Sequence, residues 1–222
     1  MKTLYHYPLC PFSRQIRICF KELDINISLI KEDFWLRKPH FLKLNPAGEL
    51  PILTELSGLV VAGVYPITEY LHEKYPTCDF MDPDPENACE IRRLLGWFNV
   101  KFYREVTKLI LDEKLIRLLS NAGTPRTEYI RAAGANLVHH LKYMTTLLSS
   151  RGWLAQDRMT FADIAAASHL SVLDYFGQVS WDNYPEVKEW YSIIKSRPSF
   201  KPLLQDTAAG FTPPTHYTDL DF

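Results

Sequence analysis

The sequence lacks several features that would assign a class of protein directly. Its 25 basic and 26 acidic side chains nearly cancel, and a formal net charge of -1 argues against a nucleic-acid or anionic-membrane surface. No apolar run is long enough to cross a bilayer. Four cysteines, at positions 10, 19, 78 and 89, show neither paired zinc spacing nor a disulfide framework. We therefore expect no metal site and free thiols. The N-terminus lacks the apolar core of a signal peptide, so we expect a cytoplasmic protein.

What is present is the composition of an ordinary globular protein. Hydrophobic residues make up 46% of the chain and charged residues 23%. At 222 residues the chain is long enough for one large domain or two small ones. The first eighty residues read as strand, helix, strand, an irregular stretch, then a hairpin and a helix, whereas the rest is helical with few breaks.

The first turn carries the clearest chemical signal. Residues 3–7 alternate like a strand, Pro8 breaks it, and Cys10-Pro11 opens a helix. Cys10 therefore faces unpaired backbone N–H groups and the positive end of a helix dipole, which predicts a thiol pKa below that of free cysteine. Ser13 follows one turn later, within reach of the sulfur. The alternative is a small residue packed at a strand–helix corner, and spacing alone does not decide between the two.

A second signal lies in the proline-rich loop that precedes the hairpin. Pro51 stands immediately before a strand, and its place beside the Cys10 corner predicts a cis peptide bond after Leu50. Such a bond would leave the N–H and C=O of Leu50 free to pair with an extended peptide. A hairpin through residues 59–61 and a helix over residues 65–75 follow.

Three motifs fall in the order and spacing of the thioredoxin-like domain of the glutathione S-transferase superfamily. They are Cys10-Pro11-Phe12-Ser13, Asn45-Pro46-x-Gly48-x-x-Pro51 and Ile67-x-x-Tyr70-Leu71. With its initial cysteine, the chain resembles the beta and omega classes. The resemblance implies an α/β thioredoxin-like domain at residues 1–78, a linker at 79–86 and an all-α domain at 87–204. It also implies a noncovalent homodimer.

The same resemblance implies glutathione as the co-substrate and assigns candidate site residues. Cys10 would contact the glutathione sulfur or form a mixed disulfide with it, with Ser13 beside it. The positions for the rest of glutathione would be Leu50 and Pro51 at the cysteinyl backbone and Arg37 or Lys38 near the glycyl carboxylate. An electrophile or disulfide would sit in an apolar pocket between the domains. We expect that pocket to be lined by Tyr7, Trp97, Phe102 and Tyr103.

One part of the family pattern is missing. The family places a Glu/Asp-Ser pair four and three residues before the Ile of Ile-x-x-Tyr-Leu, where it holds the γ-glutamyl group of glutathione. Here those positions are Gly63 and Val64, which offer neither a charge nor a hydroxyl. Each charge-assisted hydrogen bond lost in this way costs roughly 1.5–3 kcal/mol, or about tenfold or more in affinity. The departure predicts a fold that survives with a weakened glutathione site.

The helical part has its own signals. Residues 87–120 form one long amphipathic pattern, and Thr124-Pro125 predicts the cap of a helix over residues 126–149. Thr160 and Asp163 have the spacing of a capping box before an alanine-rich segment. In the family this signature marks the buried central helix of the C-terminal domain, so we assign Asp163 a structural role rather than a catalytic one.

The tail at residues 205–222 has no helical or strand period, which predicts an extended or disordered segment. It holds three aromatic residues, and acids alternate with Leu220 and Phe222. Such a segment can act as a docking peptide or fold against its own domain. The tail and the lost Glu-Ser pair are similar to the FzlA-type branch of the superfamily. These bacterial proteins bind filaments of the division protein FtsZ and do not rely on glutathione.

Two functional hypotheses stay open. In the first, the protein is a transferase that conjugates glutathione to a small electrophile or exchanges it with a disulfide. In the second, it is a non-catalytic scaffold that binds a protein partner, such as an FtsZ-type filament, through its helical domain and tail. Superfamily membership favours the transferase, because most such folds keep some glutathione chemistry.

Overall fold

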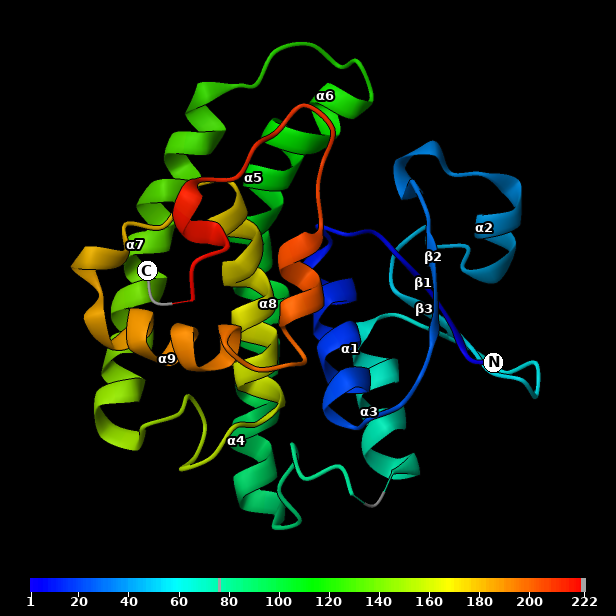
Figure 1. The fold of residues 1–222 in the computed structure, drawn as a ribbon, viewed down its shortest axis with the longest axis horizontal. Helices are drawn as coiled ribbons and strands as arrows, with labels where there is room; N and C mark the ends of the chain where they lie inside the picture. Colours follow the sequence, from blue (N-terminus) through cyan, green and yellow to red (C-terminus); the bar gives the residue numbers. More distant parts are fainter. Residues whose placement is uncertain (76, 221–222) are drawn as a thin grey trace.

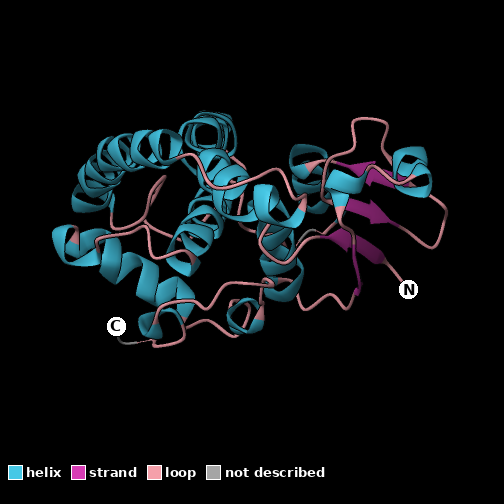
Figure 2. Ribbon diagram, turned by 90° about the horizontal axis from the view of Figure 1, so that it is seen from above, coloured by secondary structure: helices cyan, strands magenta, loops and turns pink. Residues whose placement is uncertain are grey.

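A four-stranded sheet forms the N-terminal part of the computed structural model, which describes residues 1–75 and 77–220. The strands are β1 (Thr3–His6), β2 (Ser28–Lys31), β3 (Ile52–Thr54) and β4 (Val60–Ala62), in the order β2-β1-β3-β4. β1 pairs parallel with β2 and antiparallel with β3, and β3 pairs antiparallel with β4. The sheet occupies one end of the molecule, as Figures 1 and 2 show, and the helical part the other.

Three helices accompany the sheet. They are α1 (Pro11–Glu22), α2 (Pro39–Leu44) and α3 (Val64–Lys74). α1 and α3 lie on the side of the sheet that faces the helical part, and α2 lies on the other side (Figure 1). Because α1 packs against both α8 and α3, even its polar side chains Arg14 and Gln15 are buried.

The predicted long helix is present as one continuous helical run from Pro85 to Leu119. Its segments are α4 (Pro85–Gly96), the π-helical η2 (Trp97–Thr107), α5 (Lys108–Leu111), the π-helical η3 (Asp112–Ile116) and α6 (Arg117–Leu119). Asp84 caps it by accepting hydrogen bonds from the N–H groups of Glu86 and Asn87, both at 3.0 Å. α4 thus begins inside the linker that we predicted at residues 79–86.

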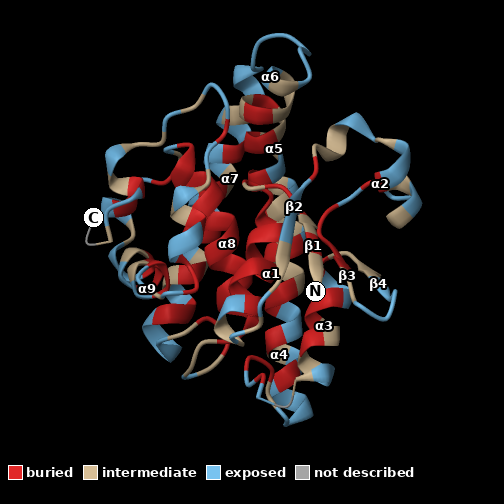
Figure 3. Ribbon diagram, turned by 45° about the vertical axis from the view of Figure 1, so that its right-hand side comes forward, coloured by how far each residue is buried: buried red, intermediate tan, exposed pale blue. Residues whose placement is uncertain are grey.

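The remaining helices surround α8 (Phe161–Tyr175). They are α7 (Thr127–Arg151) and α9 (Pro185–Lys195), with a 3₁₀ turn η4 (Trp181–Asn183) between α8 and α9. Every residue of α8 is buried, and Figure 3 shows this helix at the centre of the buried core. The predicted capping box is confirmed, because the N–H of Thr160 donates to Asp163 at 2.9 Å and the Thr160 hydroxyl accepts from the start of the helix. No helix within residues 1–75 and 77–220 has both the length and the apolarity needed to cross a membrane.

The cap that we predicted for α7 is wrong. The helix begins at Thr127 rather than after Thr124-Pro125, and its preceding residue, Arg126, makes no side-chain cap. Instead, the buried carboxylate of Glu113 accepts a hydrogen bond from the Arg126 N–H at 2.8 Å and pairs with the Arg126 guanidinium. A side chain thirteen residues away thus binds the N–H of the N-cap residue, as the acid three residues into the helix does in a capping box, and a local motif search cannot find it.

The tail is folded rather than disordered. After a 3₁₀ turn, η5 (Lys201–Gln205), the chain returns across α8 and α9 and forms η6 (Thr215–Tyr217). Tyr217 is fully buried, and its ring packs edge-on against Tyr175 of α8 with centroids 5.2 Å apart. Of the two forms that we expected, extended or disordered, the disordered one is wrong for residues 206–220. Phe222 lies outside the described residues.

Candidate functional site

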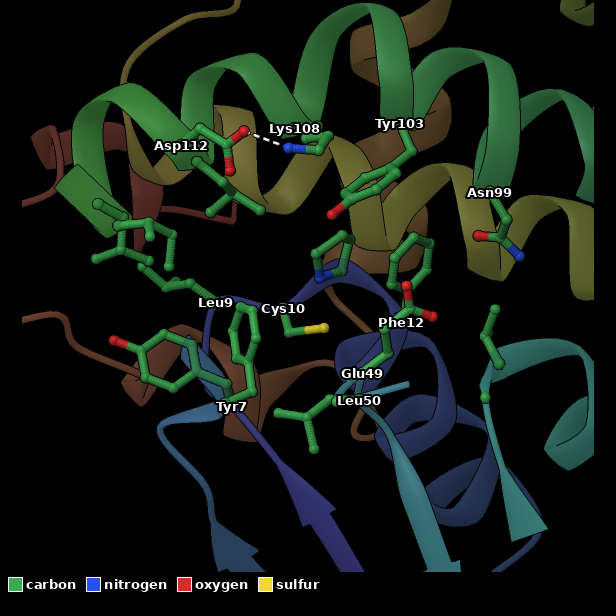
Figure 4. Close-up of a pocket in the computed structure, with 18 of the residues that line it drawn as sticks. Tyr7, Leu9, Cys10, Phe12, Glu49, Leu50, Asn99, Tyr103, Lys108 and Asp112 are labelled. Atoms are coloured by element: carbon green, nitrogen blue, oxygen red, sulfur yellow. Dashed lines mark hydrogen bonds and ion pairs between the residues drawn. The ribbon is translucent and has the colours of Figure 1, made fainter. Parts of the chain in front are cut away.

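A cavity of about 460 Å³ lies between the sheet domain and the helical run, directly at the strand–helix corner. Figure 4 shows Cys10 on its floor, with α1 beginning beside it and the helical run passing above. The loops of the sheet domain contribute one wall, and one face of the helical run contributes the other. The residues that line it include Tyr7, Cys10, Leu50, Gly63, Val64, Asn99, Tyr103, Lys108 and Asp112.

Cys10 is the residue that precedes α1, and its backbone is extended, with φ -77° and ψ 117°. Its N–H donates to Tyr7 at 3.0 Å, and its C=O accepts from the Arg14 N–H at 3.0 Å, so the turn is held on both sides. Cys10 is only 9% exposed. Burial raises the pKa of Cys10, and this outweighs the opposing hydrogen bonds from Ser13 and Phe12. Our prediction of a lowered pKa is therefore wrong: the helix terminus is present, but the cost of burying a thiolate is larger than the stabilisation that the helix start provides.

The peptide bond between Leu50 and Pro51 is cis, as predicted. Leu50 lines the cavity, and within residues 1–75 and 77–220 its N–H and C=O make no hydrogen bond. Asn45 holds this loop by donating to the C=O of Glu49 at 3.0 Å and accepting from the N–H of Ala47 at 3.2 Å. An extended ligand can therefore pair with the Leu50 main chain without breaking an existing bond.

Gly63 and Val64 lie where the sequence placed them, at the head of α3 and in the cavity wall. Gly63 has φ +97°, a backbone conformation that residues other than glycine rarely adopt. Its N–H donates to the C=O of Pro51 at 2.9 Å. No side chain caps the helix, and Val64 presents only a buried isopropyl group. Neither Gly63 nor Val64 offers a carboxylate or a hydroxyl to a ligand ammonium group, and the Tyr65 hydroxyl in the first turn of α3 already donates to the C=O of Leu95 at 3.1 Å.

Of the four residues predicted to line an apolar pocket, the structure places two in the cavity. Tyr7 and Tyr103 line it, and burial raises the pKa of Tyr7 to about 12, so its hydroxyl stays protonated. Trp97 and Phe102 do not line it. Trp97 donates to His140 at 3.1 Å, and Phe102 is fully buried next to the same ring. Both belong to a face of the helical run that packs on α7, which the linear pattern did not reveal.

The two cations predicted near a glycyl carboxylate also lie outside the cavity. Arg37 is exposed and donates to Ala47 at 3.4 Å, and Lys38 pairs with Glu32 at 3.7 Å. Among the described residues that line the cavity, the cation is instead Lys108, which forms an ion pair with Asp112 (Figure 4).

Sequence reasoning missed the polar residues of the helical wall, namely Asn99, Lys108 and Asp112. Their spacing from Tyr103, at about four residues per step, was the available signal, because residues one turn apart share a face. Among the described residues, no group of three or more histidine, cysteine or acidic side chains is placed to hold a metal ion.

A buried polar chain supports this wall from behind. His169 of α8 donates from Nε2 to the Asn99 carbonyl oxygen at 3.2 Å, while its Nδ1 lies 3.0 Å from the Thr107 hydroxyl. Burial lowers the pKa of His169 to about 3, so the ring is neutral at pH 7. These hydrogen bonds hold the Asn99 side chain in place within the cavity wall.

Comparison with known proteins defines the class to which this fold and cavity belong. The family model for the glutathione S-transferase N-terminal domain matches residues 4–83, and the model for the C-terminal domain matches residues 123–207. The chain belongs to the glutathione S-transferase family.

Comparison with individual relatives shows to which branch of that family the chain belongs. FtsZ-localized protein A of Caulobacter vibrioides is 41% identical over 224 residues, which cover 100% of this chain and 98% of that protein. The solved structure of FzlA from C. crescentus has a TM-score of 0.97 at 41% identity, covering 100% of this chain and 99% of that one. A glutathione S-transferase from Rhodospirillum rubrum F11 has a TM-score of 0.97 at 44% identity, with full coverage of both chains. The chain therefore lies in the FzlA-type branch.

Proposed function

We propose that this protein is a non-catalytic scaffold with the glutathione transferase fold, which binds a filament of the division protein FtsZ in the cytoplasm. The single observation that carries the proposal is the pair Gly63–Val64 at the head of α3. The α-ammonium of glutathione would lie against an apolar helix start, and the positive φ of Gly63 opposes an acidic side chain there. The whole-chain likeness to a protein named for its FtsZ localisation supports the same reading.

The state of Cys10 adds to this argument. Thiol exchange through a mixed disulfide on Cys10 requires the Cys10 thiolate, and burial raises the pKa of the Cys10 thiol. A buried cysteine that stays protonated is a poor nucleophile at pH 7. The cavity therefore offers space and one free main-chain pair, but not an activated sulfur.

The helical domain and the end of the tail are the proposed partner surface. Tyr217 anchors the tail in the core, and the next two residues, Thr218 and Asp219, are exposed. An anchored segment loses less conformational entropy on binding than a free one. In a homodimer, two such ends would engage one filament together and gain from a high effective concentration.

A glutathione-dependent transferase is the second candidate. The unpaired main chain of Leu50, next to the cis bond and facing the Cys10 corner, favours it. In that case the main-chain contacts would hold glutathione without help from the head of α3, and an electrophile would pack against Tyr7 and Tyr103.

High-speed pelleting with FtsZ polymerised by GTP tests the proposal. The protein should enter the pellet with FtsZ polymer and stay in the supernatant with FtsZ held in GDP. A variant lacking residues 218–222 keeps the Tyr217 anchor and should pellet much less, whereas Leu56→Ser, at an exposed hairpin of the sheet domain, should pellet normally. Failure of the wild-type protein to pellet with the polymer would refute the scaffold assignment.

A further inference from the structure

We propose that Arg14 couples the seating of tail residues 206–217 to the turn that carries Cys10. A molecule in the Cys10 cavity and a partner on the tail would then each change the affinity of the other. The coupling is a property of the chain itself; only the identity of the tail's partner rests on the function proposed above.

One side of the Arg14 guanidinium holds the turn before Cys10. Arg14 lies one helical turn after Cys10 in α1 and is fully buried. Its Nε donates to the C=O of Pro8 at 2.7 Å, and its Nη1 donates to the hydroxyl of Ser171 at 2.8 Å. The first bond fixes the path by which the chain enters the Cys10 corner, and the second ties that corner to α8.

The other side of the same group holds the C-terminal segment. Nη2 lies 3.2 Å from the Tyr217 hydroxyl, 3.3 Å from the C=O of Leu203 and 3.3 Å from a carboxylate oxygen of Asp206. The Tyr217 hydroxyl in turn donates to Leu203 at 3.2 Å. Arg17 shares the Asp206 carboxylate at 2.8 Å. Since the guanidinium is a rigid planar fork, it cannot adjust one side without moving the other.

This arrangement defines two states. With the tail seated, every edge of a buried cation meets an acceptor. With residues 206–217 released, Arg14 loses Tyr217 and Asp206, and an incompletely bonded buried cation is costly. The guanidinium then turns toward the acceptors that remain or toward water, and its bond to Pro8 is lost. The Cys10 turn loosens as a consequence.

Direct contact does not explain such coupling. The residues that line the Cys10 cavity include none from the segment 201–220. Any influence between cavity and tail must therefore pass through the residues between them, and Arg14 touches both the Pro8 carbonyl and the tail. Because the coupling is a free energy between two binding events, it acts equally in both directions.

The first test measures how fast Cys10 reacts with Ellman's reagent, located by peptide mapping, in a Cys89→Ser background that removes an exposed thiol. Tyr217→Phe keeps the buried ring and removes only the hydroxyl that meets Arg14. Loss of one hydrogen bond to a charged group raises the released population about tenfold or more, so the Cys10 rate should rise by the same factor. If hydrogen exchange shows that the tail is looser in Tyr217→Phe but the rate of the Cys10 reaction is unchanged, the proposal is overturned.

Two further variants separate coupling from local damage. Tyr175→Phe removes a hydroxyl that binds Ala208 at 2.9 Å and Phe211 at 3.3 Å, so it loosens the tail away from Arg14 and should also speed the Cys10 reaction. Tyr143→Phe removes a hydroxyl that binds only Arg93 among the described residues, and it should leave the rate unchanged. Acceleration in Tyr143→Phe to the same extent would contradict coupling through the tail.

The effect of the Cys10 turn on the tail can be measured in the same protein without any partner. Methylthiolation of Cys10 with methyl methanethiosulfonate crowds the turn, and deuterium uptake in residues 206–217 should rise. Unchanged uptake would refute the reciprocal coupling. Neither arm contains FtsZ or glutathione, so failure here leaves the scaffold assignment standing, and failure of the pelleting assay leaves this coupling intact.

Discussion

The guanidinium of Arg14 and the hydroxyl of Tyr217 meet at 3.2 Å, although 203 positions separate them in the chain. Arg14 belongs to the helix that follows Cys10, and Tyr217 to the last turn before the end of the described chain. Both are fully buried. The C-terminal segment is therefore part of the folded core, and its integrity matters to the corner that forms the candidate site.

Tyr217→Ala should destabilise the protein by about 3–5 kcal/mol, because it empties the space of a fully buried aromatic ring. Urea unfolding followed by circular dichroism measures the change. Thr218→Ala, one residue further on and exposed, should lie within about 0.5 kcal/mol of wild type. A Tyr217→Ala protein as stable as wild type would mean that the tail is not packed in solution.

The Cys10 thiol should be protonated at pH 7 and titrate at or above about 8.5, the value for free cysteine, because burial disfavours the thiolate. Thiolate absorbance near 240 nm, compared with Cys10→Ala, reports the titration. Ser13→Ala should raise the pKa further, since the Ser13 hydroxyl hydrogen-bonds the sulfur and lowers it. A titration clearly below 8.5 would restore the activated cysteine and the transferase hypothesis with it.

Glutathione binding should improve in Val64→Ser by about tenfold, because a hydroxyl at the head of α3 supplies one of the missing contacts. Calorimetric titration compares this variant with the wild-type protein, which should bind weakly. Val64→Ala is the matched control: it removes the isopropyl group without adding a hydroxyl and should not gain affinity. Tight wild-type binding would show that the Leu50 main chain suffices.

The protein should lose stability as the pH falls from 6.5 toward 4. His169 has a native pKa lowered to about 3, whereas an unfolded histidine titrates near 6.5. The unfolded state therefore binds more protons between these values, and the free energy of unfolding drops by about 3 kcal/mol by pH 4 from this residue alone. Histidine NMR should show that the His169 ring does not titrate above about pH 4. A ring that titrates near 6.5 would contradict its burial.

The sequence correctly predicted features that depend on residues close together in the chain. Pro11 in the first turn of α1, the cis bond before Pro51 and the Thr160–Asp163 capping box each depend on residues a few positions apart, and all three are confirmed. The place of Gly63 and Val64 at the head of α3 follows in the same way. Their consequence for glutathione remains a prediction.

The sequence did not predict features that depend on what packs over a residue. The thiol pKa of Cys10 depends on the helical wall above it, and Trp97 and Phe102 turn away because that face of the run packs on α7. The tail is ordered by Arg14 and by Tyr175 of α8, neither of which is near it in the chain. Each of these predictions was wrong because a contact between residues far apart in the chain decides the structure at that position.

Partner binding should require neither glutathione nor the Cys10 thiol. The most direct test is the affinity for GTP-polymerised FtsZ, measured by pelleting for wild type and Cys10→Ala, each with and without saturating reduced glutathione. FtsZ polymer should be bound in all four conditions, and glutathione in the Cys10 cavity should shift the affinity through Arg14 without being required for binding. A requirement for glutathione, or loss of binding in a folded Cys10→Ala protein, would contradict this expectation.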